Sequence, residues 1–141
     1  MRRLPLAFFS AATLCVLAGM VWGAIMGSSE DFTLAPAHAH LNLVGWTSLA
    51  LMGGFYALSG KGGRLGWLNF GLSAAAVVVM IPFLAAYLGG DKAAHTGVIV
   101  GSVLAILGMA TFAVVVFGSW RTAQAAEVEA APRRAPAAKA A

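Results

Sequence analysis

The sequence predicts an all-α membrane protein, a bundle of four transmembrane helices that run alternately up and down with both termini in the cytoplasm. Three observations predict this fold class. Hydrophobic residues make up 60% of the 141 residues and charged residues only 10%, whereas about 25% of the residues of an ordinary soluble domain are charged. The apolar residues also gather in four long stretches, and the basic residues gather in the segments that would lie on one side of a membrane.

Each apolar stretch is long enough to cross a bilayer. A helix needs about 20 residues to cross a hydrocarbon core of about 30 Å, and the four stretches have between 22 and 25 residues. They leave little chain for any other domain, so residues 1–120 are expected to form one transmembrane domain. We expect the spans at residues 4–26, 37–58, 65–88 and 93–117.

The two ends of the chain differ in character. The 23 apolar residues of the first span exceed the roughly 7 to 15 that form the core of a secretory signal. We therefore expect the first span to be an uncleaved helix. At the other end, residues 121–141 are rich in Ala, Pro and Arg, a composition typical of a disordered or only weakly helical tail. This tail is expected in the cytoplasm.

The distribution of charge predicts the orientation. Of the nine Lys and Arg residues, only Lys92 falls in a loop of the expected external side, and the other eight fall on the side of the termini. The side richer in Lys and Arg faces the cytoplasm. We therefore expect a multi-pass protein of a bacterial-type inner (plasma) membrane. The net charge of +4 is explained by this orientation in a membrane. The lipid bilayer is therefore the expected partner, and no nucleic acid is expected.

All three histidines fall at the start of spans that are expected to begin on the external side. His38 and His40 belong to the second span and His95 belongs to the fourth, so that all three are expected at a similar depth. His38 and His40 are separated by about 200° around a helix, and both cannot face the bundle interior. His40 is the deeper of the two, and ionisable groups inside a membrane usually have a function.

The histidines predict a haem site between the second and fourth helices. Two imidazoles from facing helices can bind one haem iron axially. His95 is followed by Gly97 and Gly101, small residues that are expected to leave space for a flat, bulky group. We therefore expect haem b with His40 and His95 as axial ligands, and His38 as an alternate ligand or a neighbour.

Other interpretations of the same residues stay open. His38 and His95 could each cap a helix or lie among lipid headgroups. The three histidines could instead bind copper or zinc near the external face. The chain could also be a cofactor-free structural or assembly subunit that packs through its small residues, such as the ridge of Gly19, Gly23 and Gly27 in the first span.

The second span also resembles a known family. The motif His-Ala-His-Leu-Asn-Leu-Val-Gly-Trp at residues 38–46, continued by Gly-Gly-Phe-Tyr-Ala-Leu at residues 53–58, resembles the second helix of haem-copper oxidase subunit I, and the nitric-oxide-reductase branch in particular. This resemblance implies that His40 is an axial ligand of a low-spin haem, with Asn42 and Trp46 as neighbours. It does not extend to His95, which is a ligand candidate only from its own position.

The chain departs from this family in size. The family's subunit I has about a dozen helices and a binuclear centre that needs several more histidines than the three present here. We therefore do not expect the chain to reduce oxygen or nitric oxide on its own. The resemblance implies a small cytochrome b-like protein of a respiratory chain that transfers electrons or senses a redox or gaseous signal. Respiratory-complex subunits or further copies of the chain are the expected partners. The spans contain no carboxylate for acid-base catalysis.

Overall fold

The computed structural model describes residues 3–130, with side chains as far as residue 121, and no strand occurs in this part of the chain. Four helical stretches are long and apolar enough to span a membrane. Each contains one of the four predicted spans, so the all-helical prediction is confirmed. The stretches are Arg3–Ser29, Ala35–Ser59, Gly63–Leu88 and Lys92–Arg121.

The second and fourth stretches are composite. The second begins as an α-helix, widens into a π-helix and returns to an α-helix, whereas the fourth begins with a short 3-10 turn. In chain order the elements are α1 (Arg3–Ser29), α2 (Ala35–His40), the π-helix η1 (Leu41–Ser48), α3 (Leu49–Ser59), α4 (Gly63–Leu88), the 3-10 turn η2 (Lys92–Ala94) and α5 (His95–Ala130).

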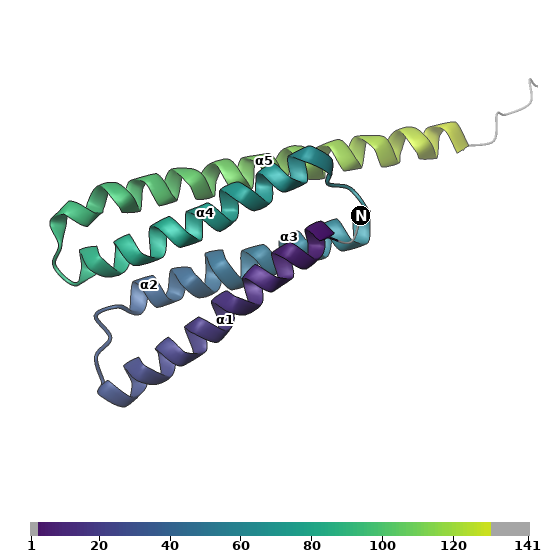
Figure 1. The fold of residues 1–141 in the computed structure, drawn as a ribbon. Coiled ribbons are helices and arrows are strands. Elements are labelled where there is room, and N and C mark those ends of the chain that lie inside the picture. Colours follow the sequence, from purple (N-terminus) through teal and green to yellow (C-terminus); the bar gives the residue numbers. More distant parts are fainter. Residues whose placement is uncertain (1–2, 131–141) are drawn as a thin grey trace, which may run out of the picture.

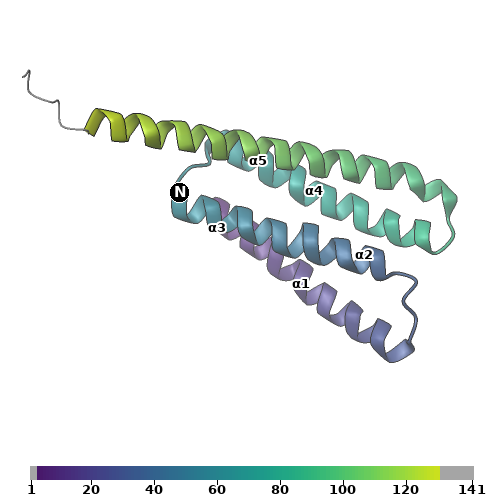
Figure 2. The same cartoon turned by 180° about the vertical axis from the view of Figure 1, so that it is seen from behind.

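The helices are arranged as two hairpins side by side (Figures 1 and 2). One hairpin consists of α1 and the α2–η1–α3 span, and the other consists of α4 and α5. The helix α4 lies between α5 and the second span in both views. The N-terminus and the α3–α4 turn lie at one end of the bundle, and the starts of α2 and α5 lie at the other. We call these the basic end and the histidine end.

The connections are short and have defined hydrogen bonds or backbone angles. At the basic end, Gly60 (φ 64°) and Gly63 (φ 52°) adopt the left-handed conformation that glycine tolerates best. At the histidine end, Asp31 Oδ1 accepts a hydrogen bond from the backbone N–H of Thr33 at 2.9 Å. The carboxylate of Asp91 accepts one from the N–H of Ala93 at 3.0 Å. Hydrogen bonds from the Thr33 hydroxyl and N–H lower the pKa of Asp31.

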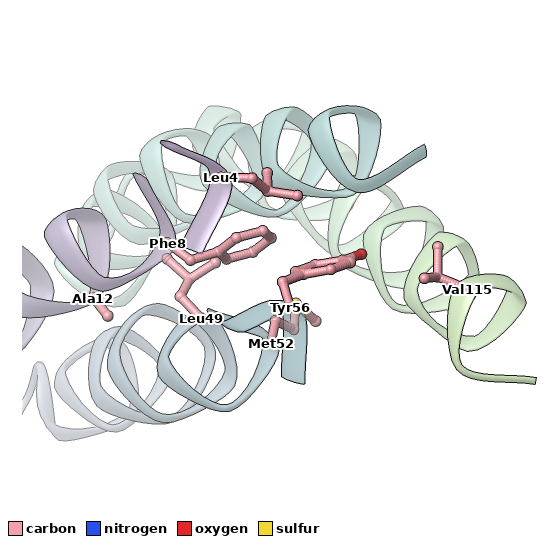
Figure 3. Packing of buried hydrophobic residues seen from close by; sticks show 7 residues of the cluster. All are labelled: Leu4, Phe8, Ala12, Leu49, Met52, Tyr56 and Val115. Atoms are coloured by element: carbon pink, nitrogen blue, oxygen red, sulfur yellow. The ribbon is translucent and has the colours of Figure 1, made fainter. Parts of the chain in front are cut away.

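The larger apolar cluster lies towards the basic end of the bundle. The rings of Phe8 and Tyr56 are stacked with their centroids 5.4 Å apart, and both side chains are almost fully buried (Figure 3). A smaller cluster joins η1 to α4. The larger cluster unites α1, α3 and α5 through Leu4, Phe8, Ala12, Leu49, Met52, Tyr56 and Val115.

One polar side chain is enclosed beside this cluster. Asn69 of α4 is 0% exposed. Its Nδ2 donates to the carbonyl O of Gly108 at 2.8 Å and to Ser73 Oγ at 3.3 Å, and the Tyr56 hydroxyl donates to its Oδ1 at 3.1 Å. Buried polar groups need such partners, because an unpaired one carries a desolvation cost. This Asn69 network therefore links α3, α4 and α5.

The last helix is longer than predicted. The fourth span was expected to end at residue 117, yet α5 continues to Ala130 and extends past the other helices (Figures 1 and 2). Residues 121–130 are therefore helical, where the sequence left open a disordered or an only weakly helical tail. Their Ala, Gln and Glu residues are good helix formers. The rest of the expected tail, residues 131–141, lies outside the described residues.

Candidate functional site

The two histidines of the second span point to different sides of their helix. His38 is half-buried and faces α1, where a Cβ placed at Gly23 would lie 3.1 Å from its Cε1. His40 is exposed. The separation of the two around the helix is as expected from their spacing. The histidine that faces the interior is His38, and the deeper His40 faces outward.

A small polar site surrounds His38. The side-chain amide nitrogen of Asn42 lies 3.3 Å from His38 Nε2 and donates to the His38 carbonyl O at 2.9 Å. The ring of Trp22 meets the imidazole edge-on with centroids 6.3 Å apart. His38 Nδ1 is buried and has no hydrogen-bond partner among the described residues. An amide that donates to Nε2 leaves the ring proton on Nδ1, so a buried donor is unsatisfied here.

Glycines of α1 make room for this site. A Cβ placed at Gly19 would lie 2.6 Å from Asn42 Oδ1, and Gly23 lies against His38. The third member of the ridge, Gly27, has no atom within 4 Å of such a Cβ. Two of the three glycines of the predicted ridge, Gly19 and Gly23, therefore allow α1 to approach the second span closely.

The imidazole of His40 makes a hydrogen bond to the backbone of its own helix. Its Nδ1 lies 2.8 Å from the carbonyl O of Pro36, one turn earlier in the same helix. A proton on Nδ1 makes this a donated hydrogen bond and leaves the Nε2 lone pair available. Ligating histidines almost always donate their second ring N–H to a carbonyl, a carboxylate or water, which fixes the tautomer and the ring orientation.

The π-helix η1 follows His40 directly and occupies the segment that carries the family resemblance. The hydroxyls of Thr47 and Ser48 donate to the carbonyl O atoms of Asn42 at 3.1 Å and Leu43 at 2.8 Å, each five residues earlier. Such wide turns are rare and frequently lie at functional sites. The sequence analysis missed this feature. The sequence signal for the π-helix was the pair Thr47 and Ser48, whose hydroxyls can donate hydrogen bonds to the carbonyl groups of a widened turn.

The other two residues predicted to surround His40 lie on different sides. Asn42 contacts His38 and not His40. Trp46 is 36% exposed and lies towards the outside of the bundle. Asn42, which was predicted beside His40, therefore lies beside His38 instead, where Trp22 also packs.

His95 lies at the start of α5, exposed, with its ring 5.3 Å from the ring of Tyr87. Lys92 Nζ lies 4.7 Å from the centre of the same Tyr87 ring. The space that Gly97 was expected to leave beside His95 is filled, because a Cβ there would overlap the ring of Phe83. These glycines allow α4 and α5 to approach closely, which corrects the expectation that they leave room for haem.

The predicted axial ligands share one end of the bundle but are not paired with each other. The starts of α2 and α5, which carry the histidines, both lie at the histidine end (Figures 1 and 2). Within residues 3–121, neither a hydrogen bond nor a ring contact joins His40 to His95. No group of three His, Cys, Asp or Glu side chains in this part of the chain is placed to hold a metal ion. The copper or zinc site therefore finds no support.

The fold defines an all-helical protein with four candidate membrane spans, and its candidate site is a pair of histidines at the start of the second span. Large apolar side chains are exposed along these helices, as expected for contact with lipid. Comparison of the chain with protein-family models, curated proteins and solved structures finds no match.

Proposed function

We propose that the protein binds haem b through His40 and uses it for electron transfer or for sensing a redox or gaseous signal. The hydrogen bond from His40 Nδ1 to the Pro36 carbonyl O carries this proposal. It orients the ring and directs Nε2 away from the helix backbone, as an axial ligand requires. The rare π-helix directly after His40 and the resemblance of residues 38–58 to haem-copper oxidase subunit I support the same assignment.

We propose His95 as the second axial ligand. Its imidazole is exposed at the same end of the bundle as His40, and no ring nitrogen of His95 makes a described hydrogen bond. Because both imidazoles are exposed, haem would bind at the bundle surface and could be shared between copies of the chain. Haem, when bound, supplies a one-electron iron couple whose potential depends on its axial ligands.

The proposed orientation places the histidine end outside and both termini in the cytoplasm, in an up-down bundle of a bacterial-type inner membrane. Two segments rich in Lys and Arg, the N-terminus and the α3–α4 turn, lie together at the basic end (Figures 1 and 2). The positive-inside rule assigns such an end to the cytoplasm.

An absorption spectrum of the detergent-purified protein tests the haem proposal. We would compare the oxidised and dithionite-reduced states and quantify haem and iron per chain. His40→Ala is expected to abolish the haem absorbance. His38→Ala, a matched removal of an imidazole two residues away, is expected to retain it, because His38 faces α1. Retained haem in a folded His40→Ala protein, or a colourless and iron-free wild type, would contradict the proposal.

His95→Ala separates the two ligands. If His95 is the sixth ligand, the variant keeps haem but loses the sharp reduced bands of a six-coordinate b-type haem. An unchanged spectrum would exclude His95 and leave His40 in place.

A cofactor-free structural or assembly subunit is the second candidate. One observation favours it: the space beside several glycines of both hairpins is occupied by side chains of the facing helix, such as Phe83 against Gly97, and is not left open for a cofactor. On this proposal the chain packs against a larger respiratory complex through its exposed apolar faces. Purified protein would then be colourless and would co-purify with oxidase subunits.

A further inference from the structure

A cavity lies at the basic end, opposite the histidines. Its volume is about 730 Å³, and three of the side chains that line it are basic: Arg3, Lys61 and Arg64. Trp67 and the glycine turn at residues 60–63 complete much of its wall. We call this cavity the basic pocket. The proposed haem function does not involve it.

The packing of Leu4 builds the basic pocket from segments far apart in the sequence. Leu4 is only 6% exposed, and a Cβ placed at Gly62 would lie 2.7 Å from its Cδ2. Gly66, one turn into α4, also contacts the Leu4 side chain. This contact fixes the first turn of α1 against the start of α4. Arg3 is thereby held beside the same cavity as Lys61 and Arg64.

The positive charge of the basic pocket has no counter-charge among the side chains that the structure describes. No acidic side chain lines the pocket, and none of its three cations forms an ion pair with a described side chain. The helix α4 begins here at Gly63, and its N-cap residue Gly62 supplies no side-chain hydrogen bond. The unpaired N–H groups of this first turn add to the positive potential. The pocket is therefore complementary to an anion.

The position of the pocket indicates which anion. It lies at the end of membrane-spanning helices, and apolar side chains of Leu4, Pro5 and Trp67 line it together with the cations. Trp67 is 47% exposed, and indole rings favour the membrane interface. We propose that the basic pocket binds the phosphate headgroup of an anionic phospholipid. Arginine suits this ligand because its planar guanidinium pairs with phosphate oxygens in a bidentate way.

Native mass spectrometry of the full chain in detergent tests this proposal. The probes are phosphatidylglycerol and, as a neutral lipid of equal chain length, phosphatidylcholine. The wild type is expected to retain phosphatidylglycerol preferentially. Arg64→Gln is expected to weaken this binding about fivefold, the effect of about one juxtamembrane cation. Arg121→Gln is the matched control, because it removes an exposed arginine that does not line the pocket.

The outcomes separate the possible explanations. Equal losses in Arg64→Gln and Arg121→Gln would mean non-specific attraction and would overturn the proposal, as would equal retention of both lipids. Displacement of the lipid by millimolar inorganic phosphate, but not by chloride at equal ionic strength, would identify a free-phosphate site instead. Lys61→Gln, on the exposed turn, is a second variant in case Arg64→Gln does not fold, and unchanged thermal unfolding confirms folding of either one.

Discussion

The two hairpins are held together by similar glycine patterns that are filled in different ways. In the first hairpin, the flexible polar side chains of Asn42 and His38 pack against Gly19 and Gly23 of α1. Small residues let helix backbones approach closely in both hairpins. The pattern predicts close approach, but the facing helix determines what fills the groove.

In the second hairpin the groove is filled by rigid groups. Gly97 lies against the ring of Phe83, and Gly101 lies against the backbone and Cβ of Met80. Around Gly97 and Gly101 this seam is apolar and closed, whereas the seam of the first hairpin holds, beside Gly23, a half-buried imidazole with an unsatisfied Nδ1. We infer that the first hairpin can adjust to a change at Gly19 or Gly23 and that the second cannot adjust to one at Gly97 or Gly101. The predictions below test this difference.

The largest effect is expected for Gly101→Ala in the closed seam. A Cβ there would lie 2.5 Å from Met80 Cβ and 2.8 Å from Met80 N, and backbone cannot move aside as a side chain can. We expect a loss of about 3 kcal/mol in the free energy of unfolding, the upper range for overpacking. Thermal or denaturant unfolding in detergent measures it. Gly71→Ala is the control, because no atom lies within 4 Å of a Cβ there. Equal stability of the two variants would contradict the closed seam.

An intermediate effect is expected for the Asn69 network, which joins the two hairpins. Asn69→Leu removes three interhelical hydrogen bonds at once, to Tyr56, Met52 and Gly108, together with the one to Ser73 within α4. Interhelical hydrogen bonds in membranes average about 0.6 kcal/mol each, so we expect a loss of about 2 kcal/mol. Tyr56→Phe removes only one of them and is expected to cost about 0.6 kcal/mol. The same unfolding measurement compares the two, and equal losses would show that the network does not act through Asn69.

The four spans could be predicted from the sequence because length and apolarity are local properties. A run of about 20 apolar residues forms a helix in a membrane whatever it contacts. The positions of His38, His40 and His95 at one end of the bundle follow from the same helices and their short connections. These features need no knowledge of how the helices pack.

Features that depend on the facing helix could not be predicted. Which of His38 and His40 faces inward depends on how Gly19 and Gly23 meet the second span. The filling of the space beside Gly97 depends on Phe83, a residue of another helix. Depth along one helix carries no information on which histidine faces the interior, because burial is decided by rotation about the helix axis and not by depth.

The basic pocket shows the same limit. Arg3 and Arg64 are far apart in the sequence. They line one cavity because the side chain of Leu4 packs against Gly62 and Gly66. The uneven distribution of charge predicted that these residues share one side of the membrane. It carried no information on which of them are neighbours.

The smallest effect is expected for Gly19→Ala in the first seam. The new Cβ would lie 2.6 Å from Asn42 Oδ1, the far end of a side chain that can rotate away. Such relief should limit the loss to about 1 kcal/mol, the low end of overpacking costs. Gly27→Ala, on the same ridge with no atom within 4 Å, is the control and should leave stability unchanged. A loss for Gly19→Ala as large as that for Gly101→Ala would show that Asn42 is held as rigidly as Met80. The hydrogen bonds of Asn42 to His38 would then fix the imidazole in place, and the first seam would be as closed as the second.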